Sequence, residues 1–265
     1  MFVTNEFVAN FQLFLLVLFR IVAMVQIAPL ISSSAIPQIA KIGISLFIAG
    51  IVFPAVVERG YAVPDNALYF FLVLLGEVLI GILIGFFLVI IFATFQLAGQ
   101  FFSLQMGFGA SQVFDPLAQI EIPLMGQFLN IIAMFVFIST QGFYKFVLVG
   151  VHSSFDALRA IDLVTGRELI LGLFIGSLGR LFATALTISF PILGTLFLIS
   201  ISTGLLAKAA PQMNLLMMGF PVAIGVAFIM LLLITPMLMN AFSRIIDVSF
   251  ESLQTLIGNI RGAGQ

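Results

Sequence analysis

The charged residues that interrupt long apolar stretches are the first candidates for chemistry in this sequence. They are Arg20, Lys41, Glu77, Arg180 and Lys208. Each would cost roughly 2.5–3.5 kcal/mol at the centre of a bilayer, so each must pair, snorkel to an interface or face water. Facing water, they would line a substrate or proton pathway. As buried charges, Arg20, Lys41, Glu77 and Arg180 would instead fix the positions of helices.

Structural pairing is the favoured interpretation of these charges, with Arg20 or Arg180 as the partner of Glu77. Proton relays usually chain several acidic groups through a membrane. Here Glu77 is the one acid that lies deep in an apolar run. Arg20 and Lys41 stand close to the ends of their runs, so they can also snorkel.

The single histidine, His152, stands beside the residue types of a hydrolytic triad. Ser153, Ser154 and Asp156 are its neighbours in the sequence. A triad is defined by geometry that a fold imposes, and adjacency in sequence does not supply it. A loop or helix-cap role is therefore favoured for His152. The chain has no cysteine, and no His, Asp and Glu cluster shows metal-ligand spacing. The residues therefore predict no catalytic triad, no cofactor and no metal site.

The most irregular stretch of the chain runs from Gly99 to Pro123, between two apolar segments. Irregular backbone at membrane depth is tolerated only where protein buries it or where it lines a cavity. Glycines here alternate with bulky apolar side chains, which suits a movable constriction. An ordinary loop on one membrane face is the alternative, and composition slightly favours it. The residues concerned are Met106, Gly107, Phe108, Gly109, Ala110 and Ser111.

Two segments share the pattern Glu-x-x-x-Gly-x-x-x-Gly. One contains Glu77, Gly81 and Gly85, and the other contains Glu168, Gly172 and Gly176. Glycines four residues apart give a helix a flat face that another helix can approach closely. The pattern indicates two related helix-packing surfaces, or only the small residues that are common in membrane helices.

The elements that carry these residues must be membrane helices. Of 265 residues, 62% are hydrophobic and 8% are charged, whereas about 25% are charged in an ordinary soluble domain. With a net charge of −1, this composition excludes a soluble enzyme, a disordered chain and a nucleic-acid binder. The chain has no Trp and three Tyr, so the usual interfacial aromatic belt is thin. Much of the surface is therefore expected to face protein as well as lipid.

We expect an all-α, multi-pass membrane protein built from bent helical hairpins, with about six apolar segments of membrane-spanning length. Two stretches, 78–114 and 181–207, are too long for one simple span. Pro191 lies inside the fifth apolar segment and Pro221 and Pro236 inside the sixth, and proline bends helices. We expect a single domain over residues 1–265, ending in an amphipathic helix at 244–261 that lies on a membrane or against a partner. The expected segments are approximately 7–28, 36–57, 67 to beyond 92, 122–144, 168–206 and 214–242.

The last two apolar segments are joined by a short polar turn. Proline after a long helix ends it, and a lysine near that end complements the helix dipole. The sequence predicts a tight helical hairpin over 181–242. Its tip consists of Lys208, Pro211, Gln212 and Asn214.

The sequence resembles the family of the flagellar biosynthetic protein FliR, whose injectisome relatives share the fold. The likeness covers nearly the whole chain and rests on the order and spacing of four stretches. They are Arg20…Pro29…Pro37…Lys41, Gly76-Glu77…Gly81…Gly85, Gly99-Gln100…Gln105-Met106-Gly107…Asp115-Pro116, and Leu206–Asn214 followed by Gly219-Phe220-Pro221.

The resemblance implies a non-enzymatic subunit of the type III protein export gate, in the bacterial inner membrane at the flagellar basal body. Family members form a helical assembly around a pore with FliP and FliQ, FlhB packs against it, and unfolded flagellar proteins pass through. The family's loop matching Met106 to Pro116, which here includes Phe114, Asp115 and Pro116, plugs the closed channel. Its last hairpin is similar to a FliQ hairpin, with the polar tip in the cytoplasm.

Two alternatives stay open. The positive-inside rule places both termini in the cytoplasm and the Lys208–Asn214 tip on the other side, against the family arrangement. We prefer the family arrangement because the charge rule assumes that simple spans insert independently. A small secondary transporter for a solute is the second function considered, since the Glu-x-x-x-Gly echo could mark an internal repeat.

Overall fold

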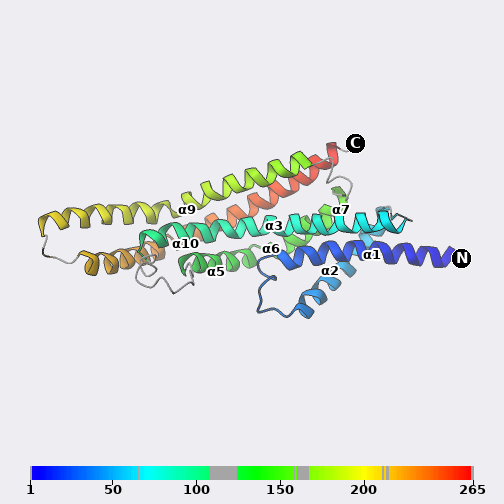
Figure 1. Cartoon of the computed structure of the whole chain (residues 1–265), viewed down its shortest axis with the longest axis horizontal. Coiled ribbons are helices and arrows are strands. Elements are labelled where there is room, and N and C mark those ends of the chain that lie inside the picture. The colour runs from blue at the N-terminus through cyan, green and yellow to red at the C-terminus, as the bar shows by residue number, and fades with distance from the viewer. Residues whose placement is uncertain are drawn as a thin grey trace. The chain divides into compact units, whose positions relative to one another are not determined.

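The computed structural model describes residues 2–61, 63–64, 66–107, 124–157, 159, 167–210, 212 and 215–263. Every regular element in this part of the chain is a helix (Figure 1). In chain order they are α1 (Phe2–Ile27), α2 (Gln38–Glu58), α3 (Ala67–Gln105), α5 (Leu124–Ser139), α6 (Gly142–Lys145), the π-helix η1 (Phe146–Ser153), α7 (Ser154–Ala157), α9 (Arg167–Ala209) and α10 (Leu215–Ala263).

The prediction of an all-α, multi-pass membrane fold is confirmed. In the described ranges, 5 helices are long and apolar enough to cross a membrane, and the count is up to 6 if a broken pair forms one span. That pair consists of α5 and the helical segment Gly142–Ser153. The break falls at Gln141, which takes a left-handed conformation with φ 57°.

Three helices are much longer than the roughly 20 residues that a bilayer requires. Helix α3 has 39 residues, α9 has 43 and α10 has 49. The prolines inside α9 and α10 do not end these helices. The expected C-terminal amphipathic helix is the last part of α10, since no breaker separates it from the apolar segment before it. Ile246, Phe250 and Leu253 are buried in this part of α10, and Glu251 is exposed.

The chain forms two compact units. Unit 1 comprises residues 1–90, 141–177 and 247–265, and unit 2 comprises residues 91–140 and 178–246. The boundaries fall inside α3, α9 and α10 and beside the break between α5 and α6. No linker therefore separates the units along the chain.

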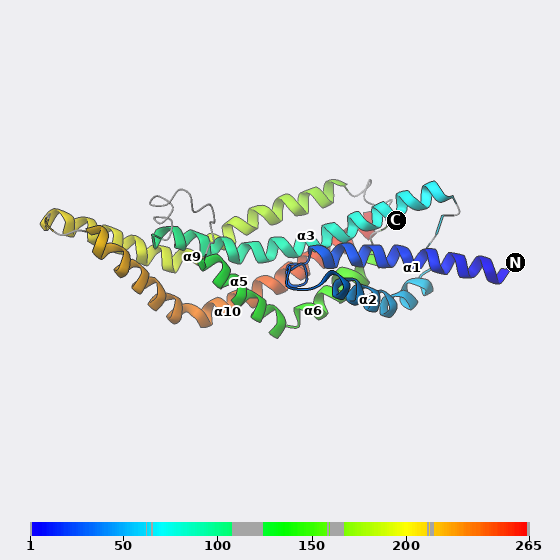
Figure 2. The ribbon, with the colours of Figure 1, turned by 60° about the horizontal axis from the view of Figure 1, so that its bottom comes forward.

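The centre of unit 1 is the contact of α1 with α2 and with the first part of α3. Helices α1 and α2 form a hairpin (Figures 1 and 2), in which Phe14 and Phe53 meet edge to face at 5.5 Å between ring centroids. On the other side of α1, the glycines of α3 allow a close approach. A side chain at Gly81 would collide with the carbonyl oxygen of Arg20, and one at Gly85 would lie 3.0 Å from the carbonyl oxygen of Met24.

Unit 2 is packed around phenylalanine rings. Phe95 of α3 and Phe242 of α10 are both fully buried, with ring centroids 4.2 Å apart. Phe92 of α3 lies 5.5 Å from Phe137 of α5. Gly99 packs against the backbone of α5 at Met125 and Gly126. Aromatic pairs of this kind contribute about 0.5–1.5 kcal/mol beyond the area they bury.

Large apolar side chains also lie on the outside of both units. Phe47 of α2 is 71% exposed, Phe190 of α9 is 68% exposed and Leu232 of α10 is 75% exposed. Apolar surface on this scale is incompatible with water alone. Lipid or other protein chains must cover it.

We expect Gly81→Ala to destabilise the protein and Gly172→Ala to leave it unchanged or slightly more stable. The Cβ at residue 81 would lie 2.8 Å from the Cβ of Ala23 and against backbone atoms of Arg20. No atom of the described residues lies within 4 Å of a Cβ at residue 172. Overpacking of this kind costs about 1–3 kcal/mol, and Ala in a helix is favoured over Gly by about 0.5–1 kcal/mol. The measurement is the thermal midpoint of a fluorescent-protein fusion in detergent, followed by size-exclusion chromatography. Equal midpoints for the two variants would contradict the packing described.

Candidate functional site

The strongest polar feature of unit 1 is an ion pair between α1 and α3. The Nε atom of Arg20 lies 2.5 Å from Oε2 of Glu77, and both side chains have no exposure to solvent. Arg20 stands on the inner face of α1 together with the buried Leu16 and Met24. Gly81 lies one helical turn after Glu77, so the backbone of α3 comes close enough to α1 for the two side chains to meet.

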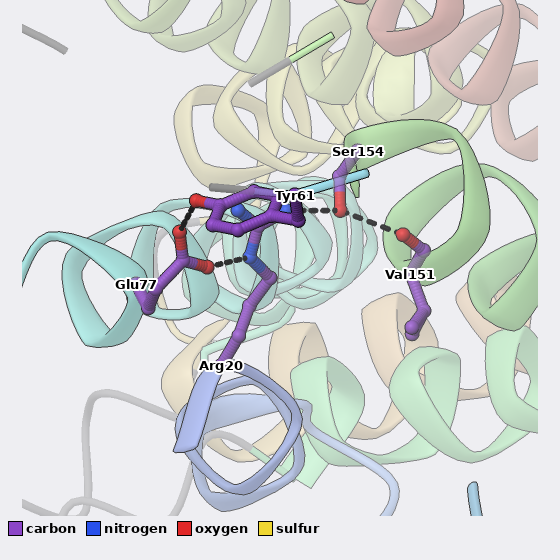
Figure 3. A network of polar contacts seen from close by, with 5 residues as sticks. All are labelled: Arg20, Tyr61, Glu77, Val151 and Ser154. Carbon is purple, nitrogen blue, oxygen red and sulfur yellow. Dashed lines mark hydrogen bonds and ion pairs between the residues drawn. The ribbon is translucent and has the colours of Figure 1, made fainter. Parts of the chain in front are cut away.

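Further side chains complete the surroundings of this pair (Figure 3). The hydroxyl of Tyr61 donates to Oε1 of Glu77, so both carboxylate oxygens are engaged. The Nη1 atom of Arg20 donates to Oγ of Ser154 at 3.1 Å, and that hydroxyl donates to the carbonyl oxygen of Val151 at 2.8 Å. We call these residues, Arg20, Tyr61, Glu77, Val151 and Ser154, the Arg20 network.

An aromatic ring covers the cation of the Arg20 network. The Cζ atom of Arg20 lies 3.7 Å from the centroid of the Phe155 ring, which attracts a cation through its electron-rich face. Charges without solvent contact are stable only when paired and hydrogen-bonded. The network meets that requirement, and it joins α1, α3, the connection before α3 and the start of α7.

The structure pairs Glu77 with Arg20 and not with Arg180. Lys41 is also buried, and its Nζ donates to the carbonyl oxygen of Ser32 at 3.0 Å in the connection between α1 and α2. Arg180 is exposed, so the burial expected for it is not found within this chain. It lies on an outer face of α9, where its long side chain reaches the surface.

His152 does not take part in a triad geometry with its neighbouring serines. Its Nε2 atom lies 2.9 Å from Nη2 of Arg59. An arginine side chain can only donate, so the histidine nitrogen is the acceptor of this contact. Ser153 donates to the carbonyl oxygen of Leu148 at 3.1 Å, and Ser154 belongs to the Arg20 network. The side chain of Asp156 lies outside the described residues.

A second ion pair anchors the end of α10 within unit 1. The Nζ atom of Lys145 lies 2.5 Å from Oδ1 of Asp247, and both side chains are partly exposed. Ion pairs with this exposure contribute about 0–1 kcal/mol. The pair therefore adds little to the stability of the fold, but it favours one position of the C-terminal part of α10 beside Lys145.

The two predicted glycine surfaces differ in the structure. Gly81 and Gly85 pack against α1, whereas no atom in the described ranges lies within 4 Å of the positions that a Cβ atom would take at Gly172 and Gly176. The sequence echo is therefore not matched by equivalent packing inside the described part of this chain.

The predicted loop and hairpin tip are described only in part. Met106 is 1% exposed, and Gly107 has a φ of 90°. Lys208 and Gln212 are exposed. The remaining predicted residues lie outside the described part of the chain: Phe108, Gly109, Ala110, Ser111, Phe114, Asp115, Pro116, Pro211 and Asn214. Among the described residues, no group of three or more His, Cys, Asp or Glu side chains could hold a metal ion.

Several residues of the site carry no recognisable signal in the sequence. Tyr61 has the pattern of an ordinary interfacial ring, and Ser154 and Phe155 lie far from Arg20 along the chain. The π-helix η1 ends directly before Ser154. π-Helical turns occur often at functional sites, but no residue pattern in 146–153 predicts a π-helix there.

These features define the class of the protein: an all-helical, multi-span membrane protein organised by a buried ion-pair network. The chain belongs to the family described as bacterial export proteins, family 1, which it matches over residues 11–248. The family resemblance inferred from the sequence is thereby confirmed.

Three relatives illustrate the family. The chain is 32% identical to the flagellar biosynthetic protein FliR of Borreliella burgdorferi over 91% of this chain and 89% of that protein. It is 28% identical to FliR of Bacillus subtilis, over 96% and 97% of the two chains. It is 24% identical to FliR of Escherichia coli, over 97% of both.

We expect Arg20→Met and Glu77→Leu each to destabilise the protein strongly, because each leaves a buried charge without its partner. Breaking a buried pair in this way costs about 3–5 kcal/mol. The measurements are the amount of protein in the membrane and the thermal midpoint in detergent. Arg244→Met and Glu251→Leu serve as matched controls because both residues are exposed on α10. Losses in the controls as large as those in the network variants would contradict a special role for the buried pair.

Proposed function

We propose that this protein is a subunit of the flagellar type III protein export gate. In this proposal it forms a pore with FliP- and FliQ-like subunits, through which unfolded flagellar proteins are exported, and an FlhB-like subunit packs against it. The protein lies in the bacterial inner membrane at the flagellar basal body. The observation that carries the proposal is the match to the export family over residues 11–248, together with FliR relatives that align over nearly their whole length.

The structure supports a role in an assembly through the surface that it leaves uncovered. The helices α9 and α10 expose large apolar side chains along their length, including Phe197, Leu205 and Met237. Both helices are more than twice as long as a bilayer requires. Apolar surface beyond the reach of lipid needs other subunits to cover it.

The plug of the proposed gate is the loop from Met106 to Pro116. Met106, at its beginning, is a buried residue of unit 2. The tip Lys208–Asn214 faces the cytoplasm in this arrangement. A reporter inserted after the exposed Gln212 tests that orientation, and labelling only from the periplasmic side would overturn it.

A secondary transporter is the less supported alternative. Both carboxylate oxygens of Glu77 are already engaged, one by Arg20 and one by Tyr61, so neither is available to bind a solute or a coupling ion. An internal repeat would place the two Glu-x-x-x-Gly segments in equivalent settings, and Gly81 and Gly172 are in different ones. Substrate-stimulated flux in liposomes that contain only this chain would favour the transporter.

We expect the tagged protein to co-purify with FliP- and FliQ-like subunits from its native membrane and to accumulate poorly when these are deleted. The physical reason is the exposed apolar surface of α9 and α10, which partner chains would bury. The measurement is a mild-detergent pull-down with identification of the bound chains, and an unrelated polytopic membrane protein carrying the same tag is the control. A stable, monodisperse monomer with no bound export subunits would contradict the proposal.

A further inference from the structure

Backbone hydrogen bonds continue from the C-terminal end of α3 to Gly107. The amide of Met106 donates to the carbonyl oxygen of Phe102 at 2.8 Å, and the amide of Gly107 donates to that of Leu104 at 3.1 Å. The side chain of Met106 is 1% exposed. The helix therefore ends in a tightened turn that is packed inside unit 2 and is not frayed.

Two contacts join this end of α3 to the α9–α10 hairpin within unit 2. The Nε2 atom of Gln105 donates to Oγ of Ser200 on α9 at 3.2 Å. The ring edge of Phe220 on α10, at Cδ1 and Cε1, occupies the space that a side chain at residue 107 would need. Both helices of the hairpin thus hold the last turn of α3.

Gly107 is required here for two independent reasons. Its φ of 90° is a conformation that L side chains rarely adopt. The Phe220 ring also leaves no room for a Cβ atom. Phe220 is partly buried. It directly precedes Pro221, which has no backbone N–H and therefore removes one hydrogen bond from the first part of α10.

We propose that Phe220 is a positioning residue of the export gate. Its ring packs against Gly107 and, together with the Gln105–Ser200 hydrogen bond, fixes the end of α3 on the α9–α10 hairpin. The chain leaves α3 at this point toward the segment that forms the plug in the proposed function, on which this inference rests. Phe220 acts through Gly107 and needs no contact with an exported chain.

The first test measures where the end of α3 lies in the complete export complex. The chain has no cysteine, so Gln105→Cys with Ser200→Cys can be linked by a short bifunctional thiol reagent without background. The two cysteines remove the Gln105–Ser200 hydrogen bond, so in this background the Phe220 ring is the contact that holds the end of α3. We expect efficient cross-linking when Phe220 is present and a yield lowered several-fold by Phe220→Ala. Phe228→Ala is the matched control, since Phe228 lies on the same helix and is 43% exposed. An unchanged yield in Phe220→Ala would overturn the proposal.

The second test measures ion leak across the membrane and export of flagellar proteins into the medium. We expect Phe220→Ala to raise the leak toward that of a deletion of residues 108–116, and Phe228→Ala to match the wild type. In the deletion background, Phe220→Ala should add no further leak, because both changes act on the same segment. If Phe220→Ala fails to accumulate, Phe220→Met, which keeps apolar bulk without the flat ring edge, replaces it in both tests.

The outcomes separate this inference from the proposed function. Suppose that the deletion of residues 108–116 raises the ion leak, but that a Phe220 variant present at normal levels leaks no more than the wild type. This result overturns the positioning role of Phe220 and leaves the gate proposal intact. A deletion that neither leaks nor alters export overturns the plug itself. Additive leaks in the double variant show that Phe220 acts elsewhere, and they also overturn the inference.

Discussion

The buried ion pair of Arg20 and Glu77 is the interaction on which unit 1 depends. Two charges without solvent contact are costly in so apolar a chain, and only their mutual contact and their hydrogen bonds offset that cost. The pair requires α3 to lie close to α1, which Gly81 permits. It also requires Tyr61 and Ser154 to be in place, so the connection before α3 and the start of α7 are fixed by the same network. Replacing the pair by apolar residues need not cost much, whereas separating its members does.

Polar contacts lie inside the protein and large apolar side chains lie on its outside, and this distribution fits a subunit of an assembly. Within unit 1, polar interactions are concentrated around α1, the first part of α3 and α7, and they are satisfied internally. The outer faces of α9 and α10 offer mainly apolar side chains, such as Phe190 and Leu232. Such faces bind through packing and the exclusion of water or lipid, with little directional bonding. The protein thus has an apolar interior that contains one buried ion-pair network, and it exposes apolar surfaces that other chains or lipid can cover.

Much of the fold follows from the sequence because long apolar runs in a membrane have few alternatives to helices. Composition and run length predict the all-α class and the number of spans, and they identify Arg20 and Glu77 as charges that need partners. The continuity of α10 is harder to foresee. Nothing between Phe242 and Ile246 breaks a helix, but the change from an apolar run to an amphipathic one resembles a boundary.

The parts of the site that the sequence does not predict depend on contacts between distant segments. Tyr61 reaches Glu77 and Ser154 reaches Arg20 only because the helices pack in one particular way. The π-helix and the contact of Phe220 with Gly107 have the same origin in tertiary structure. Arg180 shows the reverse effect, since its sequence environment is as apolar as that of Arg20, yet it faces outward. The spacing of apolar residues identifies the apolar faces of a helix, but it does not predict which of these faces another helix covers.

Arg20 and Glu77 act as one unit in stabilising this protein. The most direct measurement is a double-mutant cycle with Arg20→Met, Glu77→Leu and both together, read as the thermal midpoint and the amount of assembled export complex. The hydroxyl of Ser154 keeps its bond to Val151 in the double variant, so no charge and few polar groups are left unpaired. We expect the double variant to recover most of the stability that either single variant loses. Losses that add, with the double variant less stable than both single variants, would contradict this claim.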